Sequence, residues 1–132
     1  MLINIDPIIG PEVLHTLRAM GHGDKLILCD SNFPAYSMNS LVHRLDGVDA
    51  ARAAKAILSI FPLDSFVEFP ILRMQIDNKP DELNDVHREI MEVTKSVAGE
   101  NWKIGSIERF KFYEEAKKAF AIITTNETRP FG

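Results

Sequence analysis

The chain has 132 residues, 45% hydrophobic and 26% charged, which is typical of one globular domain spanning residues 1–132. Its formal net charge of -4 argues against binding to nucleic acid or to an anionic membrane, since both favour a basic surface. No apolar run is long enough for a membrane span, and the first residues lack the features of a secretion signal. We therefore expect a cytoplasmic protein that binds neither nucleic acid nor membrane.

Breaking residues and apolar spacing predict alternating helices and strands. Pro11 marks a helix start because proline is tolerated in a first turn, and Gly21 is placed to end that helix. In chain order we expect a helix 11–20, a strand 25–29, a loop 31–40, a strand 41–45, a helix capped by residue 49 and running to about 61, a β segment 66–76 interrupted at residue 70, a helix from 80–85 to about 97, a strand 104–107, a helical turn or two over 113–118 and a strand 120–125. This alternation predicts a compact, layered α/β domain with a mixed central sheet flanked by helices.

Cys29 is the only cysteine, and it follows the apolar run of residues 26–28. A single cysteine excludes an intrachain disulfide, which fits a reducing compartment. We expect a small buried side chain here rather than a reactive thiol.

His22 is the first candidate for chemistry, because it lies between Gly21 and Gly23, just after the first expected helix. Flanking glycines let a substrate approach the backbone closely, and an imidazole can hold or release a proton near neutral pH. The alternative is a histidine that only terminates the helix through a hydrogen bond. The segment is not a phosphate loop, since it lacks the longer glycine spacing and the Lys-Ser/Thr ending.

Asp30 ends the strand 25–29, at a position that often lines ligand crevices in α/β sheets. Its carboxylate could bind substrate hydroxyls or orient His22. The alternative is a structural role, in which Asp30 caps the following loop through the amides of residues 31 and 32.

Arg109 follows the apolar strand 104–107. Its rigid fork of donors could hold several hydroxyl or ring oxygens. A structural salt bridge to Glu108 or Glu114 is the alternative.

The remaining histidines are weaker candidates: His15 on the surface of the first helix, His43 in a strand and His87 in a polar helix segment. No spacing of His, Cys, Asp and Glu matches a metal site. We therefore expect neither a metal nor a cofactor.

Five segments resemble, in the same order, the ribose pyranase/L-fucose mutarotase family. They are residues 21–24 (GHGD), 28–35 (LCDSNFPA), 44–47 (RLDG), 63–66 (LDSF) and 109–114 (RFKFYE) with its continuation 116–121 (AKKAFA). Each segment alone is modest, but five in register are specific. The first two are more similar to the L-fucose mutarotase branch than to the ribose pyranase branch.

The resemblance implies an isomerase that interconverts the anomers of a monosaccharide, with L-fucose favoured, and that uses no cofactor or metal. It implies a ring-shaped homo-oligomer, commonly a decamer, with sugar sites near subunit contacts. It also implies that His22 is the catalytic acid/base and that Asp30 and Arg109 bind the sugar. Three alternatives stay open: a non-catalytic monosaccharide-binding protein accessory to uptake or regulation, an isomerase of a different sugar, and a purely structural oligomer.

The C-terminal segment departs from the family pattern. The family carries a tyrosine two residues before an asparagine, both touching the sugar, and then a last strand. In residues 127–132 Phe131 takes the tyrosine's place and the asparagine is absent. Phe131 is therefore the expected substrate-binding residue, in a site that is weakened, retuned to another sugar or inactive. A sequence cut short at its C-terminus is a further alternative.

Overall fold

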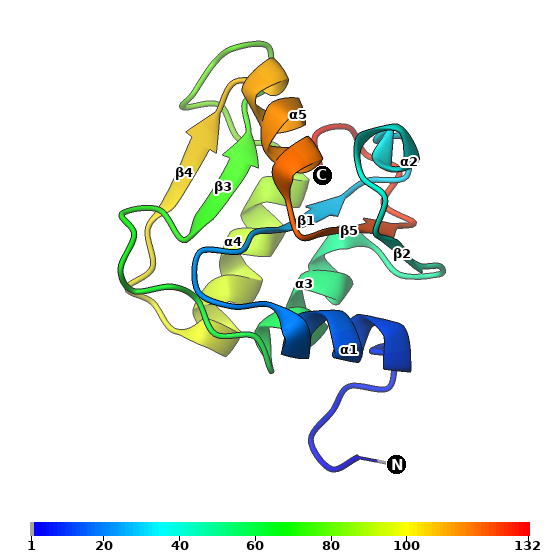
Figure 1. Ribbon diagram of the computed structural model, residues 1–132. Coiled ribbons are helices and arrows are strands. Elements are labelled where there is room, and N and C mark those ends of the chain that lie inside the picture. The colour runs from blue at the N-terminus through cyan, green and yellow to red at the C-terminus, as the bar shows by residue number, and fades with distance from the viewer. Residues whose placement is uncertain (1) are drawn as a thin grey trace.

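The computed structural model describes residues 2–132, and helices and strands alternate along most of the chain (Figure 1). In chain order they are α1 (Pro11–Ala19), β1 (Leu26–Cys29), α2 (Ala35–Met38), β2 (Val42–Leu45), α3 (Ala50–Leu58), β3 (Ile71–Met74), α4 (Asp85–Ala98), β4 (Ile104–Ile107), α5 (Arg109–Lys118) and β5 (Ala121–Thr125). Within residues 2–132, none of these helices is both long and apolar enough to cross a membrane. The α/β class is confirmed.

The strands form two separate parallel sheets. One has the order β1-β5-β2, and the other pairs β3 with β4. The expectation of a single mixed sheet is therefore wrong. Helical connections carry the chain back across each sheet, so that paired strands run in the same direction.

The central strand β5 shows why this arrangement is stable. Two adjacent residues of β5, Ile122 and Ile123, are both fully buried, although successive side chains of a strand point to opposite faces. Ile123 packs in a core with α1 and α3, whereas Ile122 packs in a second core with α2 and α5. Helices therefore cover both faces of the β1-β5-β2 sheet (Figure 1).

Two helices differ from the sequence prediction. α2 lies inside the segment expected to be a loop, because four residues are too few to show a helical period. α5 begins at Arg109 rather than near residue 113. The Glu108 carboxylate accepts hydrogen bonds from the backbone N–H groups of Phe110 and Lys111 and so caps the helix start.

Cys29 is buried, with 2% of its surface exposed, and its thiol donates to the carbonyl of Ile123 (3.6 Å). Burial raises the pKa of this thiol to about 12, and the nearby charge of Asp30 adds to the rise. The expectation of an unreactive, buried side chain is confirmed.

Candidate functional site

Asp30 lies directly after β1, at the carboxyl end of the three-stranded sheet. Its carboxylate accepts a hydrogen bond from the backbone N–H of Asn32 (2.9 Å), so the predicted loop cap is present. Burial raises the pKa of the Asp30 carboxyl, and the charge of Glu127 adds to the rise against the opposing effect of backbone N–H groups. The Asp30 side chain is half-buried and therefore keeps some contact with solvent.

The C-terminal segment, residues 127–132, runs beside Asp30. The backbone N–H of Asp30 donates to the carbonyl of Gly132 (2.9 Å), and that of Ser31 donates to the carbonyl of Glu127 (2.8 Å). Phe131 has a left-handed backbone with φ 62°, which is uncommon for a bulky residue. The structure therefore places the backbone of Phe131, which directly precedes Gly132, close to Asp30.

Glu127 is a buried carboxylate in the same region, with 3% of its surface exposed. Arg129 donates to it from its backbone N–H (3.0 Å), Nε (2.9 Å) and Nη2 (2.9 Å). These bonds lower the pKa of Glu127 to about 2. Glu127 therefore stays ionised, and its charge is compensated by Arg129.

Arg109 is the first residue of α5, and its Nε donates to the Tyr113 hydroxyl (3.0 Å). Its guanidinium carbon lies 5.4 Å from the centroid of the Tyr113 ring, a cation–π arrangement. The Tyr113 ring in turn meets the edge of Phe33, which lies three residues after Asp30 (centroids 5.5 Å apart). The start of α5 and the Asp30 loop therefore lie at the same end of the molecule.

The alternative role for Arg109, a salt bridge, is not found within residues 2–132. Glu108 caps α5 instead, and Glu114 pairs with Lys117 (3.1 Å). The fork of Arg109 thus keeps donors available for a ligand.

His22 lies on an exposed turn, with 71% of its side chain exposed. Its Nδ1 is 3.8 Å from the Asp64 carboxylate, and its ring meets the ring of Phe66 edge-on (centroids 5.4 Å apart). The turn is closed by Asp24, whose carboxylate accepts from the Gly21 N–H (2.7 Å). The His22 imidazole takes no part in closing this turn and is accessible.

A single chain does not bring His22 to the other candidates. His22 precedes β1 and Asp30 follows it, so four extended residues, spanning about 13 Å, lie between the two turns. Figure 1 shows the loop between α1 and β1 at the left and the red C-terminal segment at the upper right. Asp30 and the C-terminal segment thus lie beyond the carboxyl end of β1, whereas His22 lies before its amino end.

Four neighbours of these candidates had no role predicted from the sequence. Asp64 and Phe66 lie within one of the resembling segments, but nothing in their spacing links them to His22. Tyr113 follows Arg109 by four residues, one helical turn, and a correct start for α5 would have paired them. Glu127 gave no signal, because a lone carboxylate in a loop is ordinarily exposed.

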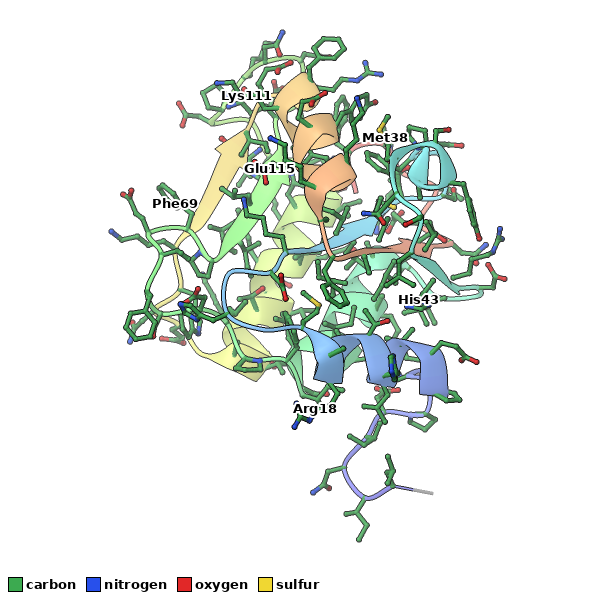
Figure 2. All side chains as sticks on the ribbon, viewed as in Figure 1. Arg18, Met38, His43, Phe69, Lys111 and Glu115 are labelled. Carbon is green, nitrogen blue, oxygen red and sulfur yellow. The ribbon has the colours of Figure 1, made fainter. Side chains whose placement is uncertain are left out.

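The other histidines in the first half of the chain are structural or solvent-exposed. His43 lies on β2 beside α1 (Figure 2), where its Nε2 is 2.7 Å from the Thr16 hydroxyl. His15 is exposed on α1, as expected. Across residues 2–132, no group of three or more His, Cys, Asp or Glu side chains is placed to hold a metal ion.

Fold and candidate site together define an α/β protein whose Asp30 loop and C-terminal segment meet at the carboxyl end of a parallel sheet, where such proteins often bind ligands. The chain belongs to the RbsD / FucU transport protein family, whose profile matches residues 3–132. It is 40% identical over 134 residues to the L-fucose mutarotase of Actinobacillus pleuropneumoniae serotype 5b (strain L20), covering 100% of this chain and 92% of that relative.

Two solved structures are also similar to this chain in sequence and fold. Protein Atu2016 is 46% identical with a TM-score of 0.95, covering 100% of this chain and 91% of that one. The fucose mutarotase from Streptococcus pneumoniae, solved in complex with L-fucose, is 34% identical with a TM-score of 0.88, covering 99% and 93%.

Proposed function

We propose that this protein is a mutarotase, an isomerase that interconverts the anomers of a monosaccharide, and that L-fucose is its substrate. The observation that carries the proposal is the full-length similarity to relatives named L-fucose mutarotase. The geometry supports it, since the carboxyl end of the sheet offers a carboxylate, a guanidinium and an aromatic ring for an uncharged sugar. The single buried cysteine fits a reducing compartment, so the cytoplasm is part of the proposal.

Mutarotation opens a cyclic hemiacetal and closes it with the other anomeric configuration. The anomeric hydroxyl loses a proton while the ring oxygen gains one, and closure reverses both transfers. An accessible imidazole can accept a proton in one direction and return it in the other. His22 takes this role in the proposal because its ring is exposed and flanked by glycines.

Asp30, Arg109 and Phe131 bind the sugar in the proposal. The half-buried Asp30 carboxyl accepts hydrogen bonds from sugar hydroxyls, and the Arg109 fork donates to sugar oxygens. The Phe131 ring covers an apolar face of the pyranose. Compared with the family's tyrosine, it lacks one hydroxyl, and a lost neutral hydrogen bond costs about 0.5–1.5 kcal/mol.

A complete site in this proposal needs two chains, because His22 and Asp30 lie at opposite ends of β1. The surface around His22 suits a subunit contact. Phe66 is 85% exposed, and Val67, Phe69 and Leu72 extend the apolar surface. We therefore include in the proposal a ring-shaped homo-oligomer, with the decamer as the expected form, in which His22 of one subunit faces Asp30 of another.

Exchange NMR tests the proposal directly. Saturation of one anomeric proton should transfer to the other anomer within the relaxation time when the protein is added, and fastest for L-fucose in a panel with D-ribose and D-galactose. Binding of a sugar with exchange no faster than in buffer would favour the non-catalytic binding protein. Faster exchange of D-ribose or D-galactose than of L-fucose would reassign the substrate.

A further inference from the structure

Helix α4 holds the C-terminal segment at three successive residues. The Asn84 side chain donates to the carbonyl of Pro130 (2.9 Å), and His87 Nε2 lies 2.8 Å from the carbonyl of Phe131. Because a carbonyl only accepts, His87 Nε2 carries the proton and donates it. The sequence had left His87 without a role.

The third contact is an ion pair between Glu89 of α4 and Arg129. Both nitrogens of the Arg129 fork donate to the Glu89 carboxylate, at 2.8 and 2.7 Å. The same guanidinium binds Glu127, so Arg129 joins the helix to the segment's own buried carboxylate.

The C-terminal segment is also held by the Asp30 loop. Its carbonyls at Glu127 and Gly132 accept the backbone N–H groups of Ser31 and Asp30. A Cβ on Gly132 would lie 2.8 Å from the Glu127 side chain and 3.0 Å from that of Val86, which leaves room only for glycine. Residues 127–132 therefore form a rigid bridge between α4 and the Asp30 loop.

The bridge also accounts for the backbone of Phe131. A left-handed conformation is unfavourable for phenylalanine and persists only where surrounding contacts fix it. The hydrogen bond from His87, whose surface is 4% exposed, acts on the carbonyl of this same residue.

We propose that His87 is the positioning residue of the sugar site: through the Phe131 carbonyl it fixes both the Phe131 ring and the Asp30 loop. Glu89 supports it through Arg129. This inference rests on the proposed function of Asp30 and Phe131. His87 itself touches no substrate.

Two substitutions of His87 separate positioning from general packing. Within residues 2–132, His87 Nδ1 has no hydrogen-bond partner, so only the Nε2 bond is at stake. His87→Gln keeps a donor that can reach the Phe131 carbonyl, whereas His87→Leu keeps bulk and loses the donor. Arg88→Gln is the matched control, because the Arg88 guanidinium donates to the Asp85 carboxylate and to the Leu83 carbonyl, neither of which belongs to the C-terminal segment.

Two quantities are measured: the hydrogen exchange of the Asp30 amide in the absence of sugar, and the rate of anomer exchange. In His87→Leu, the amide of Asp30 should exchange with solvent about tenfold faster, because its acceptor at Gly132 loosens. Anomer exchange at low sugar concentration should fall about tenfold as well. His87→Gln should restore both, and Arg88→Gln should alter neither. Should His87→Leu fail to fold, Glu89→Gln removes the charge of the Glu89–Arg129 ion pair at a partly exposed position and should shift both readouts in the same direction.

Each contrary outcome is recognisable. Asp30 amide protection in His87→Leu equal to that of the parent overturns the bridge. Loosened protection with parental anomer exchange overturns its role in the site. A parent protein that accelerates no anomer exchange defeats the proposed function first, before any variant is made, and this inference with it.

Discussion

The two ends of β1 are built differently. At the carboxyl end, Asp30 is half-buried, hydrogen-bonded to the chain's last residues and close to the charge of Glu127. At the amino end, the His22 side chain is 71% exposed, with its Nδ1 3.8 Å from the Asp64 carboxylate and its ring edge-on to Phe66. One end is held by hydrogen bonds within the chain, and the other carries an exposed imidazole beside the exposed ring of Phe66.

In the proposed mechanism the two ends of β1 have different roles: the carboxyl end binds the sugar, and the amino end supplies the imidazole. Groups that recognise a ligand bind more tightly when they are rigidly held, because ordering a flexible site on binding costs free energy. A proton shuttle can be supplied by a neighbouring subunit, provided that the contact between subunits fixes its position. The comparison therefore predicts that changes at the two ends have different signatures.

The largest expected effect is at the exposed end. His22→Ala should lower the rate of anomer exchange about 10²–10⁴-fold, the range of general acid–base groups, without lowering the thermal unfolding temperature. Saturation-transfer NMR on L-fucose and circular dichroism measure the two quantities. His15→Ala, at an exposed histidine of α1, should retain parental exchange; a His22→Ala variant as fast as the parent would remove His22 from the mechanism.

The next effect concerns stability at the carboxyl end. The pKa of Glu127 is about 2 in the folded protein against 4.5 for an unperturbed glutamate, so its ion pair stabilises the fold above pH 4.5. This contribution, about 3 kcal/mol, is lost as the pH falls from 4.5 towards 2. Urea unfolding from pH 6 to pH 3 should show a steeper loss for the parent than for Glu127→Gln. Parallel curves would contradict the buried ion pair.

Sequence reasoning reached the strand-end position of Asp30 because a continuous apolar run is a strong signal, and β1 indeed packs into cores on both faces. It also predicted a strand at residues 104–107, where β4 lies. It missed α2 and the start of α5, where the decisive interactions are a four-residue turn and a glutamate cap.

The site was harder to predict than the fold. Its candidates are separated along the chain by up to about a hundred residues, and no period links them. The separation of His22 from Asp30 could have been inferred from the strand between them. The contact between His87 and Phe131 could not, because it depends on how α4 packs in three dimensions.

A smaller effect tests the binding role of the carboxyl end of β1. Phe131→Tyr restores the hydroxyl that the family carries and should raise L-fucose affinity about tenfold, the worth of one neutral hydrogen bond. The concentration dependence of anomer exchange gives this affinity. An unchanged value would mean that the ring edge of Phe131 does not face the sugar, whereas a gain in rate at saturating sugar would show that the hydroxyl also passes a proton.

Oligomers reassembled from two variants test whether His22 of one subunit and Asp30 of another form one site. His22→Ala and Asp30→Ala chains should each be nearly inactive alone. If each site takes its imidazole from one subunit and its carboxylate from another, an oligomer reassembled from equal amounts of the two variants contains about a quarter of sites with both residues intact. Anomer exchange should then recover to roughly a quarter of the parental rate. If both residues came from one chain, every site would carry one defect, and mixing would restore nothing.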